Sequence, residues 1–227
     1  MLLFAGLGLR LLVFGTLVAP AFSLQFSFTS VQQCATLQLS FSGLTSPVSG
    51  TPSSLTIIPF NATAIVVPLS NPNLSTGITL SPLPFTAGSE FIVSLDDDNG
   101  NGIINNSDIF PVLPSPKENT ACIPSPDELA PQFFTMVSPL VYQCQDFAIN
   151  FNTTVSPQAP SVRLYIPSGP SFTLNTTSVD LGRGVATYTM TLPFGHGTIL
   201  AIGNGDGTTE TTPLLLGMTR PLINLVN

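Results

Sequence analysis

The residues most able to do chemistry gather in one Asp- and Asn-rich stretch, residues 97–108. Oxygen-bearing side chains stand at positions 1, 3, 5, 9 and 12 of an EF-hand-type loop, with Gly102 at position 6. These side chains are Asp97, Asn99, Asn101, Asn105 and Asp108. Ca²⁺ is bound by oxygen ligands at this spacing, and glycine permits the sharp turn between them. The pattern therefore predicts Ca²⁺ as the one candidate cofactor, with these five residues as its ligands.

The surroundings of this stretch favour a simpler interpretation, an Asx- and Gly-rich hairpin loop without metal. Residues 90–95 read as a strand, and Pro111 prevents the helix that follows an EF-hand loop. The second half of the chain makes the same connection with residues 203–207, which lack most of the ligands. Asn105 also begins an Asn-x-Ser sequon, and a glycan there would obstruct its use as a ligand. We therefore keep Ca²⁺ binding as an alternative to the hairpin.

Catalytic residues are not indicated anywhere in the sequence. His196 is the only histidine, and no Gly-x-Ser-x-Gly elbow or reactive cysteine motif accompanies it. Its place in a Gly-rich turn is typical of a histidine exposed to solvent. A glycosidase needs two carboxylates across a sugar cleft, which grouped acidic residues do not establish, and the chain has no Trp to stack on sugars. The sequence predicts a protein that is not an enzyme.

Three cysteines predict one disulfide and one leftover thiol. Cys34 lies on an early strand of the first half and Cys122 just after its last strand, so we expect these two to pair. A bond between Cys122 and Cys144 is the alternative pairing. As the odd residue, Cys144 is a buried inert thiol, or it forms an intermolecular disulfide, or its partner belonged to a lost last segment.

The N-terminus has the pattern of a secretory signal peptide over residues 1–23. Arg10 precedes a short apolar core, and small residues allow cleavage after Ala21 or Ser23. The uninterrupted apolar run is shorter than the roughly 20 residues of a membrane span. No second stretch is long enough, so we expect a secreted or cell-surface protein with no membrane span after cleavage.

The charge pattern excludes a role on nucleic acid. The formal net charge is −7, and only 7% of the residues are charged, against about 25% in ordinary domains. Nucleic-acid binding needs Lys and Arg to neutralise phosphates. Five sequons instead predict N-glycosylation on exposed loops or strand edges. Their asparagines are Asn61, Asn73, Asn105, Asn152 and Asn175.

The chain repeats itself with an offset of about 110 residues, the size of one β-sandwich. Gln33-Cys34 aligns with Gln143-Cys144, residues 83–88 with 192–197, and residues 56–59 with 164–167. Alternating Val-, Ile- and Phe-rich runs between Pro and Gly clusters predict strands. They lie at residues 35–41, 55–58, 64–67, 91–95, 147–151, 162–166 and 185–192. We therefore predict an all-β protein of two tandem Ig-like, Greek-key β-sandwiches, at residues 24–124 and 132–227, joined by a Pro-rich linker at 125–131.

The order of motifs resembles the extracellular regions of basidiomycete-type fungal surface proteins with tandem Ig-like repeats. The resemblance lies in Gln33-Cys34, Phe41-Ser42-Gly43, residues 55–59, 83–88 and 96–102, and Cys122. It implies an Ig-like fold outside the cell and brings no particular activity. We expect a non-catalytic secreted or cell-surface glycoprotein, a structural or binding module of the fungal cell exterior, with cell-wall polysaccharide or surface proteins as partners. The alternative is a Ca²⁺-dependent adhesion or carbohydrate-binding module that uses residues 97–108.

Overall fold

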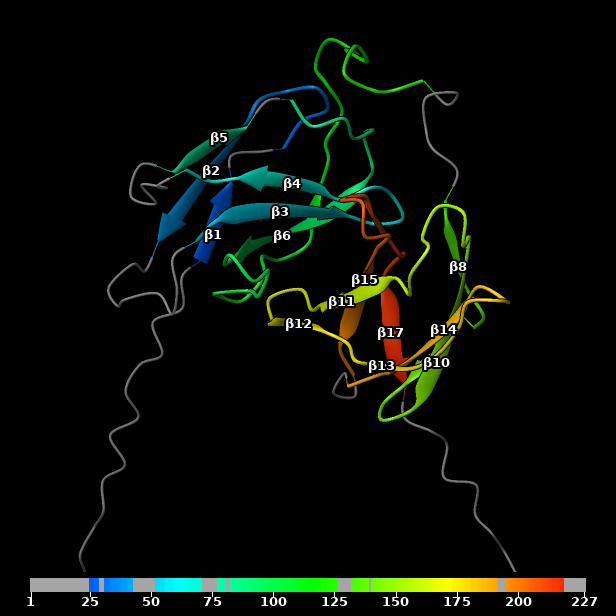
Figure 1. Cartoon of the computed structure of the whole chain (residues 1–227). Coiled ribbons are helices and arrows are strands. Elements are labelled where there is room, and N and C mark those ends of the chain that lie inside the picture. Colours follow the sequence, from blue (N-terminus) through cyan, green and yellow to red (C-terminus); the bar gives the residue numbers. More distant parts are fainter. Residues whose placement is uncertain are drawn as a thin grey trace, which may run out of the picture.

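The computed structural model describes residues 25–28, 31–42, 52–70, 77–80, 82–125, 132–138, 140–191 and 195–218. Every regular element among them is a β-strand, arranged in four sheets that form two sandwiches (Figure 1). The predicted all-β sandwich class is confirmed. No helix in the described part of the chain has the length and hydropathy of a membrane span. The signal-peptide prediction falls on residues outside the described part.

The N-terminal sandwich is built from two antiparallel sheets. One has the order β1-β2-β5, and the other has the order β4-β3-β6-β7. The first sheet comprises β1 (Gln25–Phe28), β2 (Leu37–Ser42) and β5 (Ile78–Leu80). The second comprises β3 (Ser54–Pro59), β4 (Ile65–Pro68), β6 (Glu90–Asp96) and β7 (Phe110–Pro111). The chain forms β1 and β2 in the first sheet and β3 and β4 in the second, returns to the first sheet at β5, and ends in the second with β6 and β7.

The C-terminal sandwich follows the same plan with more strands. Its first sheet, β13-β14-β10-β8, comprises β8 (Phe134–Met136), β10 (Asp146–Phe151), β13 (Thr176–Asp180) and β14 (Val185–Thr189). Its second sheet has the order β12-β11-β15-β17-β9, and β16 also pairs with β15. These strands are β9 (Val141–Tyr142), β11 (Ser161–Tyr165), β12 (Ser171–Thr173), β15 (Gly197–Gly203), β16 (Thr209–Thr211) and β17 (Leu215–Met218).

Each sandwich has its own apolar core, because alternate residues of every long strand point between its two sheets. In the N-terminal core, Leu55 and Ile57 of β3 meet Phe91, Val93 and Leu95 of β6. In the C-terminal core, Val162 and Leu164 of β11 meet Leu200 and Ile202 of β15. All of these side chains except Leu200 and Ile202 lie on strands that the period-two pattern predicted, and in those strands the pattern identified the inner face.

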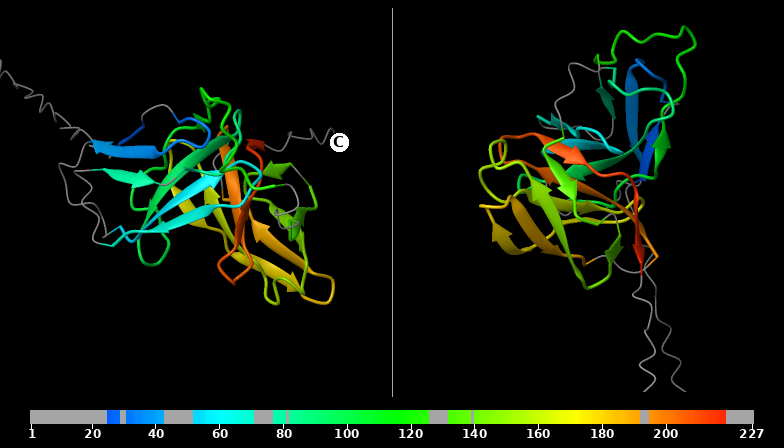
Figure 2. Two further views of the ribbon diagram at one scale, coloured as in Figure 1. Left: turned by 90° about the horizontal axis from the view of Figure 1, so that it is seen from above. Right: turned by 90° about the vertical axis from the view of Figure 1, so that its right-hand side faces the viewer.

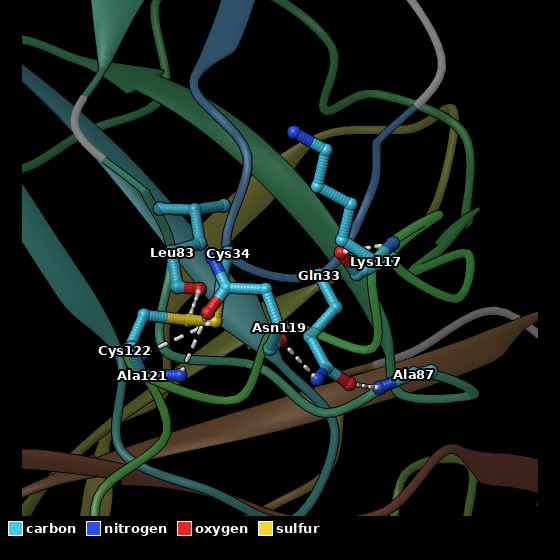
Figure 3. The surroundings of a disulfide bond; sticks show 9 residues. Gln33, Cys34, Leu83, Ala87, Lys117, Asn119, Ala121 and Cys122 are labelled. Atoms are coloured by element: carbon cyan, nitrogen blue, oxygen red, sulfur yellow. Dashed lines mark hydrogen bonds between the residues drawn. A yellow bond between two sulfur atoms is a disulfide. The ribbon is translucent and has the colours of Figure 1, made fainter.

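A disulfide between Cys34 and Cys122 closes the N-terminal sandwich, as predicted (Figure 3). The two cysteines are 88 residues apart in sequence. The side chain of Gln33 fixes the same corner, because its amide nitrogen donates to the Asn119 carbonyl and its oxygen accepts from the Ala87 N–H. The leftover Cys144 is an exposed free thiol, so the expectation that it is buried is wrong.

Candidate functional site

The two sandwiches lie directly against each other, sheet to sheet (Figure 2). Outward-facing residues of β3 and β6 meet outward-facing residues of β11 and β15 in a third apolar cluster (Figure 1). Its buried members are Ile58, Ile92, Tyr165, Ile199 and Ala201. We call this contact the junction. It buries the second face of each sheet, so these strands are covered on both sides.

The sheet register also corrects the sequence alignment of the two halves. Ile58 pairs with Ile92, and Tyr165 pairs with Ile199. The alignment of residues 56–59 with 164–167 places Ile58 opposite Ile166, which lies in the C-terminal core, whereas the junction residue at that end of β11 is Tyr165. A slip of one residue exchanges the two faces of a strand, so that alignment matched a core residue, Ile57, with a junction residue, Tyr165.

Backbone pairing reinforces the junction at one end. The turn between β3 and β4 lies beside β16 of the other sandwich, close enough for antiparallel hydrogen bonds (Figure 1). The N–H of Asn61 donates to the Thr212 carbonyl at 3.1 Å, and the N–H of Thr211 donates to the Ala62 carbonyl at 2.9 Å. The Thr211 hydroxyl also donates to the Pro59 carbonyl. Strand hydrogen bonds thus cross from one sandwich to the other.

Glu210 of β16 ties the start of the C-terminal sandwich to this pairing. Its carboxylate accepts a hydrogen bond of 3.2 Å from the N–H of Phe133, and its side chain is buried. Burial raises the pKa of Glu210 above its ordinary value of 4.5, and the hydrogen bond from Phe133 opposes that shift.

A second set of hydrogen bonds lies where the loop after β6 meets the turn between β11 and β12. The N–H of Asn106 donates to the Gly169 carbonyl at 2.7 Å, and its buried side-chain amide donates to the Ile166 carbonyl at 3.0 Å. Nearby, the Ser168 hydroxyl donates to the carboxylate of Asp108. The loop that contains the predicted metal ligands therefore serves as a contact between the sandwiches.

The centre of the junction holds a buried ion pair between Asp96, the last residue of β6, and Arg163 of β11. The Arg163 Nη2 atom lies 2.7 Å from Asp96 Oδ1, and the two side chains are 15% and 2% exposed. Asp96 also accepts hydrogen bonds from the hydroxyls of Thr56 at 2.6 Å and Ser94 at 2.7 Å. The carboxylate is thus held by three donors, which is the condition under which a buried charge is tolerated.

The guanidinium of Arg163 is positioned by its own sheet. Its Nη2 atom also donates to the Ser171 hydroxyl of β12 at 2.7 Å. Its central carbon lies 4.8 Å from the centroid of the Tyr165 ring, within the range of a cation–π contact. Burial raises the pKa of Tyr165 well above that of a free tyrosine, so this ring is neutral and acts as a wall of the junction.

The glycines of residues 97–108 are explained by this contact. A Cβ atom on Gly102 would lie 2.5 Å from Ser171 Oγ, although the backbone there has no positive φ. Gly100 has a φ of 74° and lies near the Arg163 guanidinium. Close approach of the opposite sandwich therefore accounts for Gly102, and the left-handed backbone accounts for Gly100, without a metal.

The five predicted Ca²⁺ ligands have different surroundings. The Oδ1 atom of Asp97 accepts from the N–H groups of Asn99 at 2.9 Å and Asn101 at 2.7 Å, as in an Asx-type turn, and these bonds lower the Asp97 pKa. Asn105 is exposed, and Asp108 bonds to Ser168 across the junction. Within the described residues, no group of three or more His, Cys, Asp or Glu side chains could hold a metal ion. The calcium loop stays a prediction.

The other predicted positions lie at the surface. Four sequon asparagines, Asn61, Asn105, Asn152 and Asn175, are exposed, as glycan attachment requires, and Asn73 falls outside the described residues. His196 is exposed in the turn before β15. Glycosylation itself stays a prediction at each of these positions.

A cavity of about 220 Å³ opens beside the ion pair, between the two sandwiches. Ser54, Thr56 and Asp96 line it from the N-terminal side, and Ser161, Arg163 and Thr209 from the C-terminal side. Ala201 and Gly203 of β15 also line it, and their small size leaves the space open. The walls carry hydroxyl groups together with one carboxylate and one guanidinium that neutralise each other.

Sequence reasoning did not find Arg163 or the junction. The available signal was the run of consecutive apolar residues in strands such as residues 91–93 and 199–202, which is typical of strands buried on both faces. A strand with one solvated face alternates instead. The second signal was Arg163 itself, one of the few charged residues of the chain, which lies inside an apolar strand.

No protein-family model matches the chain, and no curated protein matches it. One similar solved structure is titled "Biofilm associated protein - BSP domain". The TM-score is 0.27 and the identity 12%, over 87% of this chain and 30% of that one. The chain thus spans less than a third of the length of that protein. A likeness of this size carries no functional argument.

Proposed function

We propose that this protein is a non-catalytic secreted or cell-surface glycoprotein, a structural and binding module of the cell exterior. The observation that carries the proposal is the use of Asp96, the most buried carboxylate of the described residues, to hold the two sandwiches together. In a chain with so few charged residues, this buried Asp–Arg ion pair lies in the contact between the two sandwiches. The two sandwiches then act as one rigid unit that presents its surface and the cavity of the junction.

Two features support a place outside the cell. A disulfide persists in oxidising compartments and is rare in the cytosol, and Cys34 and Cys122 are joined. The sequon asparagines within the described residues are exposed on turns and strand edges, where a glycan can be attached. Glycans would keep a surface with few charges in solution.

The arrangement around Asp96 supports a role without catalysis. A general acid or base must reach a reacting group, whereas the oxygens of Asp96 are already bonded to Thr56, Ser94 and Arg163. The exposed His196 has no place in the cavity, whose lining residues do not include it. Binding of an uncharged ligand is the chemistry that such walls support best.

Expression of the full chain in a yeast secretion host tests the proposal. We expect the protein in the medium, with its N-terminus directly after Ala21 or Ser23 and a loss of mass after treatment with an N-glycosidase. We also expect no release of reducing sugars from a panel of cell-wall polysaccharides. Retention inside the cell without glycans, or sugar release that Asp96→Asn abolishes, would contradict the proposal.

A further inference from the structure

We propose that the cavity at the junction binds a single neutral sugar ring, such as the terminal unit of a polysaccharide. This inference rests on the proposed function and names the ligand class of the module. It is carried by the size of the cavity, the chemistry of its walls and its place between the two sandwiches.

The size of the cavity limits the ligand to about one ring. Pockets for drug-sized ligands enclose roughly 300–1,000 Å³, and this one encloses about 220 Å³. A monosaccharide unit fits this space, and a longer oligosaccharide would have to extend out of it.

The walls favour a ligand with hydroxyl groups and no net charge. The carboxylate of Asp96 and the guanidinium of Arg163 lie 2.7 Å apart and cancel each other, so neither an anion nor a cation finds an uncompensated partner. Ser54, Ser161 and Thr209 line the cavity together with the apolar residues Val66, Tyr165 and Ala201, so the walls combine apolar surface with a few hydroxyl groups. A hydroxyl group can donate and accept, which is the pattern that sugar hydroxyls match, although the Ser161 hydroxyl already donates to the Gly203 carbonyl at 3.5 Å.

The cavity has a rigid floor and an accessible rim. Asp96, Thr56 and Ala201 are buried, whereas Ser161 is exposed and Thr209 is half-buried. Because the floor residues belong to paired strands, the polar groups are placed before a ligand arrives, which reduces the entropy lost on binding. Both sandwiches contribute walls, so a bound sugar would also stabilise the junction.

Ligand-observed saturation-transfer NMR on the full mature chain tests this inference, after enzymatic removal of its own N-glycans. The probes are the methyl α- and β-glycosides of glucose, mannose, galactose and N-acetylglucosamine. We expect weak binding of at least one glycoside, in the millimolar range, and a higher melting temperature in its presence. If no glycoside gives saturation transfer, the inference is wrong.

Variants at the rim assign the binding to the cavity. Ser161→Phe should fill the opening and abolish saturation transfer. Thr209→Val keeps the shape of the side chain but removes the hydroxyl, and should weaken binding roughly threefold to tenfold. Ser178→Phe, on the exposed edge strand β13, is the matched control and should bind as the parent does. Unchanged binding by Thr209→Val and Ser161→Phe would overturn the inference.

The two proposals can fail separately. A secreted, glycosylated protein that binds no glycoside removes the sugar site and leaves the proposed function intact. A protein that hydrolyses a bound glycoside removes the proposed function and leaves the site.

Discussion

Replacing Arg163 by methionine should destabilise the protein by about 3 kcal/mol, because it removes one partner of a buried ion pair. Methionine keeps much of the length of the arginine side chain but has no charge and no donor. Asp96, with a side chain that is 2% exposed, would then lose its cationic partner. The hydrogen bond from Arg163 to Ser171 would be lost as well.

The size of this effect follows from the contacts of Asp96. Breaking a buried pair by removing one partner costs about 3–5 kcal/mol. The hydroxyls of Thr56 and Ser94 still donate to the carboxylate, which places the cost at the lower end of that range. In a folded unit of this length, 1 kcal/mol lowers the melting temperature by about 2–4 °C, so we expect a decrease of about 6–12 °C.

Equilibrium unfolding in urea, with hydrogen exchange at the backbone bonds of residues 61–64, measures this prediction. Arg183→Met is the matched control, because Arg183 pairs with Asp180 at 3.4 Å while the side chains are 83% and 51% exposed. Exposed pairs contribute little to stability. Equal stabilities for Arg163→Met and Arg183→Met, or unchanged exchange across the junction, would refute the reasoning.

Four further predictions concern the disulfide, the loop after β6, Glu210 and Ca²⁺. Cys34→Ser should cost about 4–5 kcal/mol of unfolding free energy in denaturant titrations, because it opens an 88-residue cross-link. Gly102→Ala should lower the free energy of unfolding by about 1–3 kcal/mol, because the added methyl group clashes with the opposite sandwich. Gly182→Ala is the control: it meets no such clash and should be neutral or slightly stabilising in the same titrations. The pKa of Glu210 is raised in the folded state, so protonation of Glu210 stabilises the fold. This stabilisation is present below pH 4.5 and is lost as the pH rises through the folded-state pKa. Glu210→Gln should therefore become more stable relative to the parent between pH 4.5 and neutrality, as measured by melting temperature. Calorimetric titration with Ca²⁺ should give no heat of binding, because the carboxylate of Asp97 already accepts hydrogen bonds from two backbone N–H groups. A heat of binding that is lost in Asp97→Asn would establish the calcium alternative.

The long strands could be predicted because residues that point into the core alternate along each strand with residues that point away from it. The predicted runs 35–41, 55–58 and 64–67 became β2, β3 and β4 with ends shifted by one or two residues. The short and edge strands could not be predicted in this way. Every residue of β13 is exposed, and β9 has two residues, so neither carries a burial period that a sequence pattern could reveal.

The junction could not be predicted for a different physical reason. Periodicity shows which residues of a strand share a face, but it does not show what covers that face. Ile58 and Ile92 read as ordinary strand residues until the opposite sheet is known. The acidic loop was noticed for its oxygen atoms, whereas in the structure its glycines and Asn106 make the closer contact with the other sandwich.

The charges of the junction also explain why the two different sandwiches pair with each other. When the junction residue Ile58 is matched with the junction residue Tyr165, the sheet registers place Thr56 at the position of Arg163 and Asp96 at the position of Gly203. Two N-terminal sandwiches joined through the same face would bury two carboxylates with no guanidinium to neutralise them. Two C-terminal sandwiches would bury two guanidinium groups with no carboxylate. Each mismatch would leave unpaired buried charge, which costs several kcal/mol, so the Asp–Arg pair favours the pairing of the two different sandwiches. The same asymmetry keeps the cavity open, because Gly203 lines it beside the ion pair and has no side chain to fill the space.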